Sequence, residues 1–248
     1  MIRITYAGHA TVLIESGGTR LLTDPVLRGR VAHLRRIVPS PALEELRQLD
    51  AVLISHAHFD HLDVPSLRLA GDCPAIVPRG CGRLLRRAGM SDVTEAVPGD
   101  RLRIGETEVT AVLVAHDGRR HPFSRARDTL AYVVGGRERA FFAGDTDLFD
   151  GMADLAGGID VALLPIWGWG PRVGRGHMDP ERAARAAALL DPRVAIPIHW
   201  GTLASPGAPW RSDPERPARV FVERVAAHAP GVEVRVLRPG GRTDIGPS

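Results

Sequence analysis

Residues 51–61 read AVLISHAHFDH, and the interpretation of the whole chain starts from this stretch. Its first five residues form a mostly apolar run that predicts a buried β-strand. The next six include three histidines and an aspartate, side chains that bind metal ions. A strand followed by such a loop delivers imidazoles and a carboxylate to one edge of a sheet. The alternative is a solvated histidine cluster in a surface loop, which the preceding buried strand disfavours.

Four ligands this close together do not fit comfortably around one tetrahedral ion. We therefore predict two ions, with His56 and His58 on one and Asp60 and His61 on the other.

Three more candidate ligands each follow an apolar, strand-like run. His116 follows VTAVLVA, Asp145 follows FFAG, and His199 follows VAIPI. Taken alone, either histidine is more typical of a partly buried core, and the aspartate of a turn beside glycine. Taken with the first loop they indicate metal ligands, because loops at strand ends commonly build sites. The two oxygens of one carboxylate can bridge two ions.

These seven residues resemble the ligand set of the metallo-β-lactamase superfamily. Flanking blocks are similar to the branch that holds N-acylphosphatidylethanolamine-hydrolysing phospholipase D and ascorbate-6-phosphate lactonase. The blocks are YAGHATVLI (6–14), TDPV (23–26), ISHAHFDHLD (54–63), GDT (144–146), HMDPE (177–181) and IHWGT (198–202).

The resemblance implies the α+β class and an αββα sandwich, in which two mixed β-sheets pack face to face with helices outside. We predict a single domain over residues 1–248. The superfamily's order also implies which ligands share an ion. The assignment is His56, His58 and His116 on one ion, Asp60, His61 and His199 on the other, and Asp145 as the bridge.

Two such ions lower the pKa of bound water, so the resemblance implies a metal-dependent hydrolase that directs hydroxide at a carbonyl carbon or a phosphorus. Zinc is the expected metal of a histidine-rich site, and manganese or iron also suits mixed imidazole and carboxylate ligands. We assign catalytic roles to Asp60, which can orient the nucleophile, and to His177, which can donate to a phosphate or leaving group. A structural role at a helix start is the alternative for His177.

Two further polar residues lie near the predicted ligands in the sequence. Asp24 is a candidate acceptor for the N–H of a ligand histidine, and its alternative is a turn residue before proline. His9 is expected in structural packing, and support of a metal ligand is its alternative.

The expected substrate is a small molecule or a lipid-derived one that carries a phosphodiester, a lactone or an ester. We predict its rim in the glycine-rich loop Gly168–His177 together with Arg119 and Arg120, the alternative being solvated surface loops. The Pro- and Arg-rich residues 28–48 and 201–217 are also predicted as rim loops. Nucleic acid is not expected, because no basic–aromatic interleaving suggests a stacking platform. A nucleic-acid phosphodiesterase and a non-catalytic metal-binding protein are the alternative functions.

Composition restricts the chemistry further. All 32 basic residues are arginine, and the absence of lysine excludes Schiff-base chemistry. Cys73 and Cys81 are too few for a disulfide framework and are expected as free thiols. No signal peptide is visible and no apolar run approaches the ~20 residues that span a bilayer, so we expect a cytoplasmic protein. A homo-oligomer is compatible with the sequence, which does not decide the oligomeric state.

Hydrophobic patterning predicts a chain rich in strands. The expected strands are 3–6, 11–16, 20–23, 51–55, 75–77, 107–115, 129–134, 139–143, 194–198 and 232–237. Helices are expected over 81–88, 180–190 and 218–228. Gly17 and Gly18 predict a hairpin turn between two strands.

Overall fold

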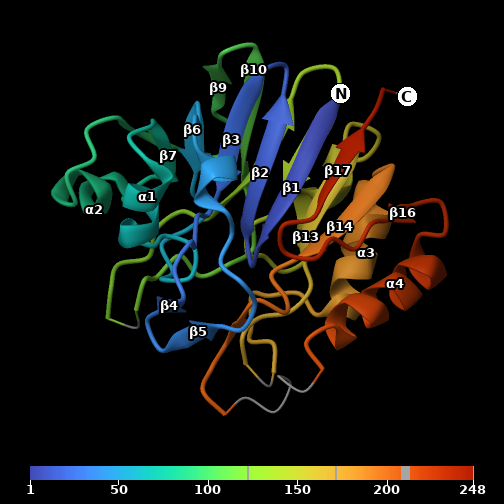
Figure 1. Ribbon diagram of the computed structural model, residues 1–248. Coiled ribbons are helices and arrows are strands. Elements are labelled where there is room, and N and C mark those ends of the chain that lie inside the picture. Colours follow the sequence, from blue (N-terminus) through green and yellow to red (C-terminus); the bar gives the residue numbers. More distant parts are fainter. Residues whose placement is uncertain (122, 171, 208–212, 248) are drawn as a thin grey trace.

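The computed structural model describes residues 1–121, 123–170, 172–207 and 213–247. Within them two large β-sheets of seven strands each lie face to face (Figure 1). A third sheet of three strands lies at the end of the sandwich opposite the chain termini.

The first large sheet has the strand order β17-β1-β2-β3-β6-β7-β8. Its strands are β1 (Ile2–Gly8), β2 (Thr11–Ser16), β3 (Thr19–Thr23), β6 (Ala51–Leu53), β7 (Ala75–Pro78), β8 (Val93–Ala96) and β17 (Arg242–Ile245). The strands from β17 to β3 pair antiparallel, and those from β3 to β8 pair parallel. The β2–β3 turn at Gly17 and Gly18 has φ values of 57° and 80°, which confirms the predicted hairpin.

The second large sheet has the strand order β16-β14-β13-β12-β11-β10-β9. Its strands are β9 (Arg101–Ile104), β10 (Thr107–Leu113), β11 (Leu130–Gly135), β12 (Arg139–Phe142), β13 (Val161–Pro165), β14 (Val194–Ile198) and β16 (Glu233–Val234). It is also mixed, since β9 to β12 pair antiparallel and β12 to β16 pair parallel. The third sheet consists of β4 (Arg30–Val31), β5 (Leu34–Arg36) and β15 (Leu203–Ala204).

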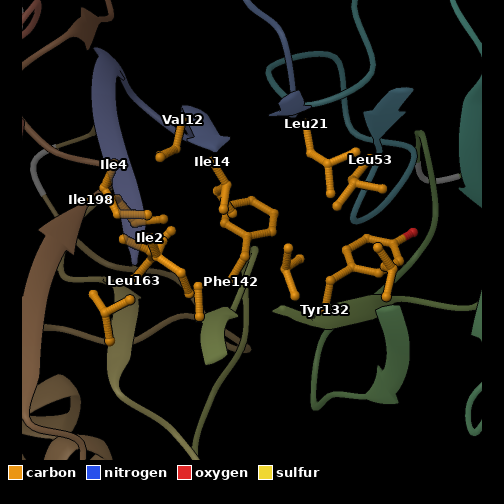
Figure 2. Packing of buried hydrophobic residues seen from close by; sticks show 14 of the residues in the cluster. Ile2, Ile4, Val12, Ile14, Leu21, Leu53, Tyr132, Phe142, Leu163 and Ile198 are labelled. Atoms are coloured by element: carbon orange, nitrogen blue, oxygen red, sulfur yellow. The ribbon is translucent and has the colours of Figure 1, made fainter. Parts of the chain in front are cut away.

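The main core lies between the two large sheets (Figure 2). Successive side chains of a strand point to opposite faces, so each central strand contributes to two layers. In β11, Leu130, Tyr132 and Val134 join this core, whereas Ala131 and Val133 belong to the outer layer of the same sheet. Both faces of the sheet are therefore buried, which explains the nearly continuous apolar strands in the sequence.

Helices cover the outer faces of the sandwich (Figure 1). The first sheet is covered by η1 (Leu43–Leu46), α1 (Val64–Ala70) and α2 (Gly82–Arg87). The second sheet is covered by η2 (Asp150–Leu155), α3 (Pro180–Leu190) and α4 (Arg216–His228). The predicted αββα sandwich is confirmed.

Local sequence signals explain the bounds of α3. The Asp179 carboxylate accepts the backbone N–H of Arg182, and Pro180 occupies the first turn, where no backbone donor is needed. The helix ends at Asp191, which adopts the left-handed conformation with φ 46°. The prediction of a helix over residues 180–190 is confirmed.

Other predicted elements differ from the structure mainly at their ends. The helices expected over 81–88 and 218–228 are α2 and α4, which differ by one or two residues at an end. The strand expected over 232–237 is reduced to β16. Residues 28–48, predicted as loop, contain two short strands and η1, whereas residues 208–212 of the other predicted rim loop lie outside the described residues. No helix in the described ranges is long and apolar enough to cross a bilayer.

The strand directions bring the predicted ligands to one end of the sandwich. Strands β10, β12 and β14 run parallel to one another in the second sheet, and β6 runs parallel to β1 in the first. The loops that follow β6, β10, β12 and β14 lie at the end away from the termini, where the small third sheet also lies (Figure 1).

Candidate metal centre

Three predicted ligands form one compact histidine group. The Nδ1 atom of His58 lies 2.9 Å from Nε2 of His56 and 3.2 Å from Nε2 of His116. The first two residues come from the loop after β6, and His116 follows β10. These ring nitrogens are close enough together to hold one metal ion.

The second group combines Asp60, His61 and His199. The Nε2 atoms of the two histidines are 3.1 Å apart, and Asp60 Oδ2 lies 3.9 Å from that of His61 and 3.8 Å from that of His199. His9, expected in structural packing, joins this group with Nε2 3.1 Å from Asp60 Oδ2. Support of a metal ligand was the alternative predicted for His9, and the contact with Asp60 agrees with that alternative.

Asp145 lies between the two groups. Its Oδ1 atom is 3.2 Å from Nε2 of His199, and its Oδ2 atom is 3.1 Å from Nε2 of His61 and 4.0 Å from Nε2 of His56. Its side chain is buried, and Oδ1 has no hydrogen-bond partner within the described part of the chain. The carboxylate thus presents its oxygens to histidines of both groups.

The outer ring nitrogens of the histidines show which nitrogen carries the proton. Nδ1 of His116 is 2.7 Å from the Gly176 carbonyl, and Nδ1 of His199 is 2.9 Å from the Trp167 carbonyl. A carbonyl oxygen only accepts, so each Nδ1 donates. A neutral imidazole then has a lone pair on Nε2, directed into the centre.

Asp24 fixes two more rings in the same way. Its Oδ2 atom accepts the Ser55 hydroxyl at 2.5 Å and lies 2.7 Å from Nδ1 of His61. The Ser55 oxygen lies 2.9 Å from Nδ1 of His56 and accepts its N–H, because the hydroxyl proton already points at Asp24. Of the two roles predicted for Asp24, the structure therefore shows the acceptor of a histidine N–H.

The inner nitrogens with lone pairs face one another and the carboxylate oxygens of Asp145, so the space between them suits a cation. Burial alone would lower the pKa of His61, but Asp145, Asp24 and Asp60 raise it well above the ordinary value, so this ring takes up a proton when no metal ion is bound. Burial lowers the pKa of His116 to about 4 and that of His199 to about 3, so these rings do not take up the proton themselves. Neutral imidazole is the form that binds metal ions. The donor set therefore fits divalent cations.

The buried negative charges of the centre also favour bound cations. Asp24, Asp60 and Asp145 are buried, and within the described ranges they pair with histidines and with no arginine. Burial alone would raise the pKa of Asp60 and of Asp145, but the neighbouring histidines hold both pKa values below the ordinary range. Buried negative charges need nearby positive charge, which a protonated His61 or bound metal ions would supply.

His177 lies at the border of the centre, on the solvent side. Its Nε2 atom is 3.3 Å from Asp145 Oδ2, and its Nδ1 atom donates to the Arg175 carbonyl at 3.0 Å. Its side chain is 26% exposed, which leaves it accessible to a substrate. Burial alone would lower the pKa of His177, but Asp145 raises it to about 9.

The arginines predicted at the rim divide into two kinds. Arg120 donates to the carbonyls of Ala57 and Leu62 at 2.6 and 3.1 Å, and its guanidinium carbon lies 4.1 Å from the centre of the Phe59 ring. Arg120 therefore braces the loop that carries the first four ligands, and its predicted contact with substrate stays a prediction. Arg119 is exposed to solvent and pairs with Asp117.

The loop Gly168–His177 approaches the centre at its C-terminal end. The carbonyl of Gly176 holds His116, and a Cβ atom at this glycine would lie 3.2 Å from Nδ1 of that histidine. Arg172 and Arg175 are exposed. Residue 171 of this predicted rim lies outside the described residues.

The chain belongs to the β-lactamase superfamily, since the model of the Beta-lactamase superfamily domain matches residues 19–200. It is a metal-dependent hydrolase with the metallo-β-lactamase fold. A UPF0173 metal-dependent hydrolase of Aeropyrum pernix is 31% identical over 97% of this chain and 96% of its own length. The N-acyl-phosphatidylethanolamine-hydrolyzing phospholipase D 1 of Caenorhabditis elegans is 32% identical over 80% of this chain and 63% of its own.

Solved structures share the fold. The metallo hydrolase Igni18 of Ignicoccus hospitalis superposes with a TM-score of 0.75 at 22% identity, covering 98% of this chain and 97% of its own. An isothiocyanate hydrolase from Delia radicum gut bacteria has a TM-score of 0.76 at 16% identity, covering 99% of this chain and all of its own. At such identities the likeness concerns the fold alone.

Proposed function

We propose that this protein is a dinuclear hydrolase that cleaves a phosphodiester in a small-molecule or lipid-derived substrate. The observation that carries the proposal is the position of Asp145, whose carboxylate faces histidines of two separate groups. One ion would be held by His56, His58 and His116, the other by Asp60, His61 and His199, with Asp145 between them. Zinc is the proposed metal, because imidazole nitrogens dominate the donor set.

When bound, two divalent ions supply hydroxide near neutral pH and stabilise the negative charge that develops on the attacked group. The protein's own residues orient the reactants. His9 and Trp169 each donate a hydrogen bond to the Oδ2 atom of Asp60. These bonds fix the position of the carboxylate relative to the nucleophile. His177 is the accessible proton donor for the leaving group, because its Nε2 atom already faces Asp145 at the border of the site.

The phosphodiester is preferred over a lactone or carbon ester for two reasons. The phospholipase D relative of Caenorhabditis elegans is 32% identical over 80% of this chain, and its name describes the hydrolysis of a phospholipid. In addition, Arg172 and Arg175 are exposed on the loop that ends at the centre, and guanidinium groups bind phosphate through paired hydrogen bonds. A lactone or ester substrate is the second candidate within the same mechanism.

The first test measures metal content and turnover together. Elemental analysis of protein prepared without chelator is expected to approach two metal ions per chain. Bis(p-nitrophenyl) phosphate is expected to be hydrolysed, a panel of lactones more slowly, and an oligonucleotide not at all. A folded preparation that stays free of metal under saturating zinc and manganese contradicts the proposal. Two bound ions without any turnover on this panel would favour a non-catalytic metal-binding protein.

The second test concerns Asp60 and His177. Asp60→Ala is expected to abolish hydrolysis but leave a folded protein. Asp60 is a loop carboxylate outside the hydrophobic clusters and is not a helix cap, so its loss leaves two N–H donors without an acceptor but opens no cavity in the core. His177→Asn is expected to lower kcat with metal content unchanged. Asp160→Asn is a matched control, since Asp160 accepts the Arg139 amide far from the centre. Near-normal turnover of Asp60→Ala would show that the assigned chemistry is wrong.

A further inference from the structure

Trp169 makes a direct hydrogen bond to the candidate metal centre. Its indole Nε1 atom lies 3.0 Å from Asp60 Oδ2, and Nε2 of His9 lies 3.1 Å from the same oxygen. A carboxylate oxygen only accepts, so both nitrogens donate. Asp60 is thus held by two N–H groups from segments far apart in the chain.

The small third sheet holds the Trp169 ring in place. The ring packs against an apolar cluster of Val26, Val31, Leu34 and Leu203, which lines this sheet. The Trp169 carbonyl also accepts the backbone N–H of Ser205 at 3.3 Å, directly after β15. In addition, His33 of the β4–β5 hairpin meets the ring edge-on, with 5.1 Å between the ring centres. Contacts on three segments therefore fix the direction of the indole N–H.

Trp167, two residues earlier in the same loop, provides the contrast. Its Nε1 atom is buried but has no hydrogen-bond partner in the described part of the chain. Its ring packs against a different cluster, beneath α3 and α4. Two tryptophans of one loop thus differ in whether the indole N–H has an acceptor, although both rings contribute to packing.

We infer that Trp169 is a positioning residue that holds Asp60 in its metal-binding orientation. The inference rests on the proposed role of Asp60 as a ligand. A carboxylate that is free to rotate binds a metal ion more weakly, because it loses conformational entropy on binding. Hydrogen bonds from fixed donors restrict the rotation beforehand and reduce this loss. Partners that orient metal ligands typically change metal affinity by about 10- to 100-fold when they are replaced. In this view the third sheet is a support for the metal centre.

The test compares Trp169→Phe with the matched control Trp167→Phe. Both variants keep an aromatic ring and the backbone carbonyl. Among the described residues, only the first variant loses a side-chain hydrogen bond. Zn²⁺ affinity is measured by competition with a chromophoric chelator, and the metal-free proteins are compared by thermal unfolding. The affinity for the more weakly bound ion is expected to fall about 10-fold or more in Trp169→Phe and to change less than twofold in Trp167→Phe.

A spectroscopic measurement separates positioning from general packing. The visible absorption of the Co²⁺-loaded protein reports the ligands around the ion, so it is expected to change in Trp169→Phe and to match wild type in Trp167→Phe. If Trp169→Phe does not fold, benzothienylalanine at this position removes only the N–H, since sulfur replaces it in a ring of nearly the same shape.

The outcomes distinguish the inference from the proposed function. Wild-type protein that binds no metal would overturn the proposed function and the inference together. Wild-type protein that binds two ions, combined with equal affinities and equal Co²⁺ spectra for both variants, would overturn the inference alone. A lower unfolding temperature of Trp169→Phe with unchanged affinity and spectrum would assign the indole a merely structural role and would also overturn it.

Discussion

Replacing Asp24 with asparagine should disturb both ion sites, although Asp24 belongs to neither proposed ligand set. The carboxylate is fully buried and accepts three hydrogen bonds. Two come from Ser55, through its backbone N–H at 2.7 Å and its hydroxyl at 2.5 Å, and one comes from His61 at 2.7 Å. Asparagine has nearly the same shape and tolerates the left-handed backbone at this position, where φ is 33°. The variant therefore changes hydrogen bonding with little change in packing.

The amide can present an oxygen to only one side. If its oxygen keeps the Ser55 backbone N–H, its NH₂ group faces the other two donors. The Ser55 hydroxyl can rotate and then donate to His56, which moves the proton of that ring to Nε2. His61 must likewise release its Nδ1 proton and take one on Nε2. Both nitrogens that faced the ions are then blocked by hydrogen.

We expect Zn²⁺ affinity at each site to fall by at least about 10- to 100-fold, which corresponds to ~1.4 to 2.7 kcal/mol. Ser55→Ala removes only the partner of His56, so it should weaken one site and leave the other near wild type. Asp100→Asn is the control, because Asp100 accepts a single backbone N–H outside the centre. Chelator competition measures the affinities, and thermal unfolding verifies the fold. Two ions bound by Asp24→Asn with unchanged affinities would refute the argument.

Three further predictions concern stability and access. Arg120→Met should lower the free energy of unfolding of the metal-free protein by about 2 to 4 kcal/mol, because it removes two charge-assisted hydrogen bonds. Denaturant titrations measure this change. A raised KM with unchanged stability would instead indicate that Arg120 binds substrate. Gly176→Ala should cost about 1 to 2 kcal/mol, because its φ is 75°, and should also weaken metal binding, as thermal unfolding and chelator competition will show. Burial raises the pKa of Cys73 to about 11 and that of Cys81 to about 12, so neither thiol should react with Ellman's reagent in the folded protein. Two thiols per chain should react after denaturant is added.

The candidate ligands could be predicted from the sequence because they lie in the loops that directly follow apolar strands. A buried strand has a strong pattern, and strands that run parallel end at the same edge of a sheet, so the ligands of the second sheet had to meet. The resemblance then supplied which sheets pack together. The ion assignment, the single domain over residues 1–248, the cytoplasmic location, the homo-oligomer and the absence of nucleic acid stay predictions.

The contacts around the ligands could not be read in the same way, because they join residues far apart in the chain. The role of Arg120 depends on carbonyl groups, which every residue has and no sequence pattern marks. For His9 the sequence favoured structural packing over support of a ligand, since nothing local shows that Asp60 lies beside it. The helix α1 was also missed, although Asp63 accepts the N–H of Ser66 and Pro65 occupies its first turn. Its seven residues are too few for a periodic apolar pattern to show.

The same contacts tie the loops of the centre to one another. His116 donates to a carbonyl of the loop that ends at His177, and His199 donates to a carbonyl at the start of that loop. His61 is held by the residue that follows β3, and the loop carrying it is braced by Arg120. Each ligand loop thus depends on a neighbour for its orientation. The loop between β13 and α3 consequently serves both the ions and the predicted rim. Its sequence is restricted by the carbonyls of residues 167 and 176 and by the side chains of Trp169 and His177.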